Sequence, residues 1–384
     1  MRDVAIIGIG QTPVDEHWDK SLKELAGTAI FNALNDAQRE TADALFIGNM
    51  LSGILSKQEN LGALISDWIG LPGIEAHKVE AACSSGAAAF RAGLLAVSSE
   101  DVDSALVVGV EKMTESLPIE TTEALATAAD ADYESAQGLS FVAINALVMQ
   151  LYLHTYGWKH TDFAPFSINA HANAIHNPYA RLHENISKKD YISARMIAEP
   201  INLLDASPTG DGAAAVFLIP ADSLLPDNKK IIQVVGSASA TDSIAIHNRK
   251  DPLWLSAAEI SANKAYQQAG IKPQDIDFFE LHDAFSIMSV LSLEACGFSK
   301  RGQAPKLGLD DQILINGRIP ISTRGGLKAR GHPVGATGVY QIIEAVQQLR
   351  GEAESTQVTD AEIGMTQNIG GSGATIITHI LRSV

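Results

Sequence analysis

A cysteine and a histidine stand in two segments that could place them together as a nucleophile and its base. Cys83 lies in the segment ACSSG (residues 82–86), whose small side chains allow close approach of the backbone just before an alanine-rich helical stretch. The positive end of a helix dipole lowers the pKa of a thiol, so this cysteine could attack a carbonyl carbon. Its neighbours are equally typical of a small buried core residue. His332, in the segment GHPVG (residues 331–335), favours the reactive interpretation, because glycine and proline fix its place before a second helix.

Two more loops offer groups that the same chemistry needs. His282 follows a short apolar pattern and begins the segment HDAF (residues 282–285). The segment NIGGSG (residues 368–373) presents closely spaced backbone N–H groups, which could stabilise negative charge on an oxygen. We expect these loops to meet those of the cysteine and the first histidine at one site. The combination indicates a cysteine nucleophile that attacks a carbonyl carbon, with N–H donors for the oxygen that becomes negatively charged.

Other motifs do not support a nucleotide cofactor or a metal. The segment GIG (residues 8–10) follows a strand pattern, but Pro13 replaces the third glycine of a dinucleotide-binding loop. His171 and His176 are five residues apart, without a carboxylate at zinc-protease spacing, so no metal site is predicted. With only two cysteines, the sequence has neither a disulfide framework nor a four-cysteine zinc site.

The elements that position these loops alternate between strand and helix, which is typical of an α/β protein. Both halves of the chain show the same order, with strands predicted at 4–9, 44–47 and 105–110 in the first half and at 231–235, 276–281 and 363–367 in the second. Aligning the first helix of each half places Asn49 within one residue of His282. The loop of Cys83 then corresponds to the loop of His332. We therefore predict a duplicated α/β unit whose halves bring these loops to the same edge.

A segment that departs from this pattern separates the two halves. Residues 112–200 are polar and helix-like, so we predict an inserted loop domain there. Residues 205–220 return to a glycine turn and an apolar strand, which would rejoin the first sheet. The predicted domains are an N-terminal α/β domain, the inserted loop domain and a C-terminal α/β domain, at residues 1–111 plus 201–225, 112–200 and 226–384.

The composition is acidic, with 45 acidic and 28 basic residues and a formal net charge of −17. This charge would repel nucleic acid, so we expect no nucleic-acid partner. Residues 137–158 form an uncharged stretch of 22 residues, but its polar side chains would be costly in a bilayer. We therefore predict a buried or ligand-lining helix there, no membrane insertion, and a cytoplasmic protein.

Together these segments resemble the thiolase superfamily over essentially the whole chain. The HDAF loop and the Asn-x-Gly-Gly ending at residues 368–371 are most similar to archaeal acetoacetyl-CoA thiolases and sterol-carrier-protein-type thiolases. The resemblance implies the thiolase fold, in which two α/β domains form a five-layer αβαβα arrangement and a loop domain is inserted in the first. It also implies a coenzyme A thioester as substrate, no prosthetic group, and a homodimer or homotetramer.

The resemblance also implies a role for each site residue. Cys83 would be the nucleophile that accepts the acyl group. His332 would take its proton and later help to hold the thioester oxygen of the incoming acetyl-CoA. His282 stands where common thiolases have an asparagine that positions a water molecule. The backbone N–H groups of Cys83 and Gly370 would form the oxyanion hole around the acyl-enzyme, and Ser207 would lie near the pantetheine arm.

One departure from the family pattern concerns the second catalytic base. Common thiolases have a second cysteine where this chain has Asn368, and sterol-carrier-type enzymes place that cysteine where this chain has Ala284. An asparagine amide cannot act as a base at neutral pH. His282 or His332 would therefore have to remove the α-proton of the substrate for full turnover.

The leading interpretation is an acetyl-CoA C-acetyltransferase (acetoacetyl-CoA thiolase), which makes or cleaves acetoacetyl-CoA. Two alternatives are a thiolase for longer or branched 3-ketoacyl-CoA and a non-catalytic CoA-binding scaffold subunit. Ketoacyl synthases share the fold but carry their histidines in other loop sequences. The archaeal resemblance further suggests a complex with HMG-CoA synthase and a small OB-fold bridging protein.

Overall fold

The computed structural model of the chain describes residues 2–223 and 230–384. Their strands form one nine-stranded sheet in the order β3-β2-β4-β7-β1-β8-β11-β10-β9 and a separate two-stranded sheet, β5-β6. The first half of the large sheet contains β1 (Val4–Gln11), β2 (Ala44–Gly48), β3 (Glu75–Val79), β4 (Ala105–Glu111) and β7 (Gly212–Pro220). The second half contains β8 (Ile232–Thr241), β9 (Phe278–Glu280), β10 (Ile363–Gly370) and β11 (Thr375–Ser383).

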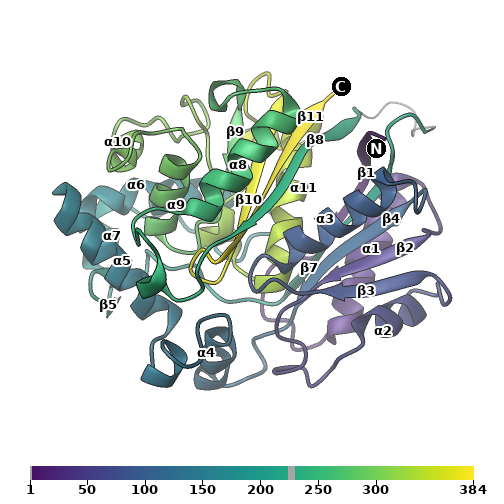
Figure 1. Cartoon of the computed structure of the whole chain (residues 1–384), viewed down its shortest axis with the longest axis horizontal. Coiled ribbons are helices and arrows are strands. Elements are labelled where there is room, and N and C mark those ends of the chain that lie inside the picture. Colours follow the sequence, from purple (N-terminus) through teal and green to yellow (C-terminus); the bar gives the residue numbers. More distant parts are fainter. Residues whose placement is uncertain (1, 224–229) are drawn as a thin grey trace.

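Helices cover both faces of each half of the sheet. On the outer faces, α1 (Leu22–Ala37) and α2 (Leu61–Trp68) pack on the first half, and α8 (Ser256–Ala269) packs on the second. Between the halves, α3 (Ser85–Ser98) and α11 (Thr337–Arg350) lie against each other (Figure 1). This is the predicted α/β thiolase fold, with its layers in the order helix, sheet, helix, sheet, helix.

The central helix layer sits in a core that both halves supply. Phe90 of α3 and Tyr340 of α11 are fully buried there, among apolar side chains of β4, β7 and β11. Burial of such large side chains is a main source of folding stability. Because these two helices begin at the loops of Cys83 and His332, the core between the halves also fixes the positions of both loops.

The predicted duplication is confirmed by the order of elements. The unit β1-α1-β2 is repeated as β8-α8-β9, and α3, β4 and β7 are repeated as α11, β10 and β11. The halves join where β1 pairs with β8, through Ala5 with Gln233 and Ile6 with Ile232. The register predicted from sequence therefore holds, since corresponding helices begin at the cysteine loop and at the histidine loop.

The predicted strands all differ from the structure at one end or both, by one or two residues in β1, β2 and β4, and β10 continues to Gly370 instead of ending at 367. β8 continues to Thr241 instead of ending at 235, because it pairs with β11 along its whole length. β9 covers only Phe278–Glu280 instead of 276–281, since the first two predicted residues and the last one lie outside its ladder with β10.

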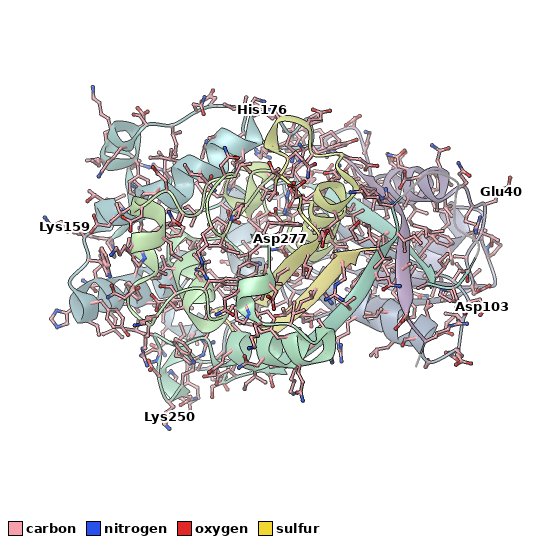
Figure 2. The ribbon with its side chains drawn as sticks, turned by 90° about the horizontal axis from the view of Figure 1, so that it is seen from above. Glu40, Asp103, Lys159, His176, Lys250 and Asp277 are labelled. Atoms are coloured by element: carbon pink, nitrogen blue, oxygen red, sulfur yellow. The ribbon has the colours of Figure 1, made fainter. Side chains whose placement is uncertain are left out.

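The chain between β4 and β7 forms a mostly helical lobe, as the sequence predicts for an insertion. It contains α4 (Pro118–Ala126), α5 (Phe141–Tyr156), α6 (Ala164–Ala174), α7 (Lys188–Ser193), β5 (Met196–Ala198) and β6 (Ile201–Asn202). From the second half, α9 (Ser286–Ala295) and α10 (Ala304–Leu309) pack against it. Figure 2 shows Lys159 at the outer side of this lobe, opposite Glu40 and Asp103 of the first half.

Two sequence predictions concern the ends and surroundings of these parts. The predicted domain limit between residues 225 and 226 lies outside the described residues. Within the described ranges, no helix is both long enough and apolar enough to cross a membrane.

Candidate active site

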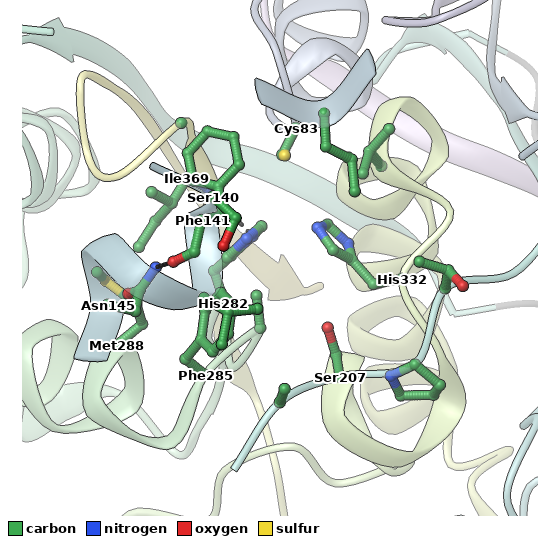
Figure 3. Close-up of a pocket in the computed structure, with 18 of the residues that line it drawn as sticks. Cys83, Ser140, Phe141, Asn145, Ser207, His282, Phe285, Met288, His332 and Ile369 are labelled. Atoms are coloured by element: carbon green, nitrogen blue, oxygen red, sulfur yellow. Dashed lines mark hydrogen bonds between the residues drawn. The ribbon is translucent and has the colours of Figure 1, made fainter. Parts of the chain in front are cut away.

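The four predicted loops meet at one pocket, which has a volume of about 220 Å³. Cys83, His282 and His332 point into it from three different loops (Figure 3). Ser207 and Gly371 also line the pocket, and most of the remaining wall is apolar, formed by Met113, Leu125, Phe141, Val142, Phe285, Met288, Val334 and Ile369. A thiol, two imidazoles and backbone N–H groups in an apolar pocket suit covalent acyl transfer, because low polarity strengthens each of their hydrogen bonds.

Cys83 is held on a strained turn at the start of α3. The preceding residue, Ala82, has a φ of 52°, in the left-handed region that residues with side chains rarely adopt. The cysteine itself is only 8% exposed. Burial raises the pKa of its thiol to about 12, and although the backbone N–H of Gly371 acts in the opposite direction, the Glu111 carboxylate adds to the increase. The resting nucleophile is therefore a neutral thiol and needs a base.

His332 is placed by a turn that requires glycine, because Gly331 has a φ of 108°. Its Nδ1 lies 2.7 Å from Thr337 Oγ1, and that hydroxyl lies 3.2 Å from the carbonyl oxygen of Pro333. When Thr337 donates to this carbonyl, it accepts from Nδ1–H of the imidazole, which leaves Nε2 free to accept a proton. Burial and then the charge of Arg330 lower the pKa of His332 to about 3, so the ring is neutral at pH 7.

His282 offers an N–H donor to the pocket, whereas His332 offers a nitrogen that accepts. Its Nδ1 lies 3.0 Å from Asn368 Nδ2 and 3.3 Å from the backbone nitrogen of Ile369, and both of these are N–H donors. Since Nδ1 accepts, the neutral ring carries its proton on Nε2. Burial, and then the charges of His332 and Arg330, lower the pKa of His282 well below its usual value. The two imidazole rings stand perpendicular, with their centroids 5.1 Å apart. Nε2–H of His282 can donate a hydrogen bond into the pocket, and Nε2 of His332 can accept one.

Two predicted site residues lie behind the pocket wall. Asn368 is 2% exposed and reaches the site through its hydrogen bond to His282. A Cβ atom at Gly370 would lie 2.5 Å from the carbonyl oxygen of Ala81, so only glycine lets β10 approach the cysteine loop. The next residue, Gly371, has a φ of 62° and directs its N–H at the Cys83 thiol. The resemblance implied Gly370 as the oxyanion donor of this loop, whereas the glycine that lines the pocket is Gly371.

Ser207 lines the pocket on a segment clamped between the two histidine loops. Its backbone N–H donates to the carbonyl oxygen of Ala284 over 2.9 Å. The backbone N–H of His332 donates to the carbonyl oxygen of the next residue, Pro208, over 3.1 Å. The side chain of Ser207 faces the same space as the imidazole (Figure 3). This segment therefore fixes the spacing between the loops.

Sequence reasoning missed most of the apolar wall. The helix expected within 137–158 is present as α5 and does line the pocket, through Phe141, Val142 and Asn145. Met288 of α9 also contributes to this wall. The one available signal was Asn145, a buried polar residue in an apolar helix, whose Nδ2 donates to the carbonyl oxygen of Phe141 over 2.8 Å.

His171 lies outside the pocket and has a structural contact. His171 is buried, and its Nδ1 lies 2.8 Å from the carbonyl oxygen of Glu184. Among the residues that the structure describes, no group of three or more His, Cys, Asp or Glu side chains is placed to hold a metal ion.

Comparison with known families assigns both halves of the chain. The family described as "Thiolase, N-terminal domain" matches residues 4–222, and "Thiolase C-terminal domain-like" matches residues 238–383. Among solved structures, the Ltp2-ChsH2(DUF35) aldolase superposes with a TM-score of 0.86 at 22% identity, covering 99% of this chain and 98% of that one. An acetyl-CoA acetyltransferase from Syntrophomonas wolfei gives a TM-score of 0.74 at 17% identity, covering 100% and 99%. At these identities the likeness shows the fold alone.

Relatives with higher identity cover the whole chain. A protein named acetyl-CoA acetyltransferase from Methanothermobacter thermautotrophicus is 43% identical over 382 residues, covering 99% of both chains. One of the same name from Methanocaldococcus jannaschii is 37% identical over 393 residues, again covering 99% of both. Bovine sterol carrier protein 2 is 28% identical over 98% of this chain and 71% of its own length. The chain belongs to the thiolase family.

Proposed function

We propose that this chain is an acetyl-CoA C-acetyltransferase, which joins two molecules of acetyl-CoA or cleaves acetoacetyl-CoA with CoA. The observation that carries the proposal is the meeting of the Cys83 thiol, the neutral imidazoles of His282 and His332, and the Gly371 N–H in one pocket. The two archaeal relatives with this name, at 43% and 37% identity, support the choice of substrate.

In the first step, the sulfur of Cys83 attacks the thioester carbonyl of acetyl-CoA. Nε2 of His332 takes the thiol proton and passes it to the sulfur of the departing CoA, so a new C–S bond forms as the old one breaks. The predicted donors to the oxyanion are the backbone N–H groups of Cys83 and Gly370. We add the N–H of Gly371, because it already points at the sulfur.

In the second step, another acetyl-CoA loses an α-proton and its enolate attacks the acetyl group in a Claisen condensation. The C–C bond forms as the Cys83 thiolate leaves. We assign the base to Nε2 of His332 and the oxyanion donor to Nε2–H of His282, since the two rings present opposite polarity to the pocket. In this assignment, Asn368 orients the imidazole of His282 and does not itself act as a base.

The reaction itself is tested with the purified protein, acetoacetyl-CoA and CoA. We expect acetoacetyl-CoA to be consumed only when CoA is present, with acetyl-CoA as the product. A parallel assay with longer and branched 3-ketoacyl-CoA substrates measures kcat/KM for the alternative substrate range. Failure to turn over any of these substrates would contradict the proposal and favour the CoA-binding scaffold.

Substitution of His282 separates the two steps. In His282→Ala, the enolate loses an N–H donor, so condensation should slow by roughly 10²-fold. Acetylation of the cysteine, which uses the other histidine, should change by less than about tenfold. Stopped-flow condensation assays and quenched acetylation of Cys83 measure the two rates. His282→Asn, which keeps an N–H donor, should recover part of the condensation rate, and an equal loss in both steps would contradict the assignment.

We also propose the finer properties that the family resemblance suggests. These are a homodimer or homotetramer, a cytoplasmic location, no prosthetic group, the three predicted domains, and a complex with HMG-CoA synthase and an OB-fold bridging protein. The solved Ltp2-ChsH2(DUF35) aldolase has, by its name, a second component beside Ltp2, which supports a search for such a partner. Light scattering of the purified protein, alone and with each candidate partner, tests the assembly.

A further inference from the structure

Glu111 is a fully buried carboxylate at the end of β4 that none of the steps above uses. Its Oε1 accepts from Asn49 Nδ2 over 2.9 Å and from the backbone N–H of Leu51 over 3.0 Å. Its Oε2 accepts from the backbone N–H groups of Met50 over 2.9 Å and Gly335 over 3.0 Å. Four N–H donors thus converge on one carboxylate, which matches the acceptor capacity of an ionised acid and of no neutral side chain.

The position of Glu111 in the duplicated fold matches that of Asn368. Each residue lies two positions beyond the last pair of a parallel ladder, β2 with β4 for Glu111 and β9 with β10 for Asn368. Asn368 orients the imidazole of His282 in the second half. In the first half, Glu111 bonds to Asn49, which the sequence alignment places within one residue of that histidine. The pair of Glu111 and Asn49 in the first half therefore corresponds in position to the pair of Asn368 and His282 in the second half.

The loops that Glu111 holds are those that surround the nucleophile and its base. Gly335 lies three residues after His332, and a Cβ atom at this glycine would come within 2.6 Å of Glu111 Oε2. Leu51 packs in one apolar cluster with Cys83. A single side chain thus ties a first-half loop beside the thiol to the second-half loop of the imidazole.

We propose that Glu111 is a positioning residue that keeps His332 in line with Cys83 for proton transfer. The inference rests on the proposed function, in which these two residues perform acylation. Glutamine is the sharpest substitution, because it has the same shape but offers one acceptor oxygen and one NH₂ group. Its NH₂ group would face two of the four N–H donors, so two of the four hydrogen bonds would be replaced by repulsion between donors.

Protonation of Glu111 should weaken its four hydrogen bonds to these loops in the same way. Burial raises the pKa of this carboxyl to about 7, although the backbone N–H groups of Met50, Leu51 and Gly335, and then the charge of Lys78 on β3, lower it. The charge of Glu111 also acts on the thiol of Cys83, at the start of α3. A proton on the carboxyl removes an acceptor, so acylation should slow as the pH falls through about 7. The pocket histidines are already neutral there.

The test measures the rate of acetyl-Cys83 formation from acetyl-CoA, by quenched flow and mass spectrometry, at pH values above and below neutrality. We expect Glu111→Gln to slow acylation by roughly 10²-fold, since a displacement of about 1 Å of a catalytic group costs that much. Its rate should also lack the decline below neutrality. Glu111→Asp, which keeps the charge but retracts it, should slow acylation less and keep the decline. Glu123→Gln, at an exposed position on α4, is the matched control and should behave as wild type.

The outcomes separate this inference from the proposed function. Wild-type acylation that shows no decline below neutrality would overturn the inference without any variant. Glu111→Gln that acylates at the wild-type rate, or slowly with the decline intact, would also overturn it. If acetyl-CoA never modifies Cys83 in the wild type, the proposed function itself fails. Equal melting temperatures of Glu111→Gln and the control would show that the loss is local.

Discussion

Thiolysis of acetoacetyl-CoA should fall by roughly 10⁴-fold or more in Cys83→Ala, because the variant lacks the atom that carries the acyl group. The other cysteine cannot take over. Cys296 is 2% exposed in the core of the second half, and its Sγ accepts from Gln367 Nε2 over 3.1 Å. Steady-state assays with acetoacetyl-CoA and CoA measure the loss.

Cys296→Ala is the matched control for this loss. It removes a buried sulfur that lines no part of the pocket, so it should keep thiolysis close to the wild-type rate. Its free energy of unfolding should fall by about 1 kcal/mol, as expected for a small cavity in a core. Wild-type activity in Cys83→Ala would contradict the covalent route.

His332→Ala should slow acetylation of Cys83 by about 10³-fold, because the buried thiol loses its general base. The loss should depend on pH in a direction set by the thiol. Burial raises the pKa of Cys83 to about 12, so the fraction of thiolate increases as the pH rises in the alkaline range. The thiolate can react without a general base. The variant should therefore gain rate as the pH rises, whereas the wild type, which has its base, gains less. Quenched-flow acetylation over neutral and alkaline pH measures both effects.

Thr337→Val tests whether the orientation of His332 matters as well as its presence. The substitution removes the hydroxyl that lies 2.7 Å from Nδ1, while the imidazole stays in place. We expect a loss of about tenfold, smaller than that of His332→Ala, because the ring loses only the bond that selects its tautomer. A rate in His332→Ala that stays high and independent of pH would contradict the role of His332 as base.

The loops were predictable because glycine and proline residues specify their backbone conformation. Glycine and proline bracket His332, and the turns at Gly331 and Gly371 adopt positive φ, so residue type and local geometry agree there. Most strands were predictable from continuous apolar runs. β3 was missed because Glu75–Val79 lies at the sheet edge and alternates exposed and partly buried residues. β11 was missed because polar residues such as Thr378 and His379 are buried in it.

The details of the site depend on contacts between distant segments, which no local pattern encodes. The choice between Gly370 and Gly371 as the pocket N–H follows from how β10 meets the cysteine loop. The tautomer of His282 follows from Asn368, which lies 86 residues away. Glu111 gave no signal in the sequence, since its partners come from both halves of the fold.

The most direct test of the central claim is to isolate the acyl-enzyme. The purified wild-type protein is incubated with acetyl-CoA, digested, and analysed by mass spectrometry, and a second sample is treated with CoA before digestion. We predict one acetyl group on the peptide that contains Cys83, and its removal by CoA with formation of acetyl-CoA. Turnover of acetoacetyl-CoA with no acetyl group on that peptide, or with one that CoA cannot remove, would contradict the claim.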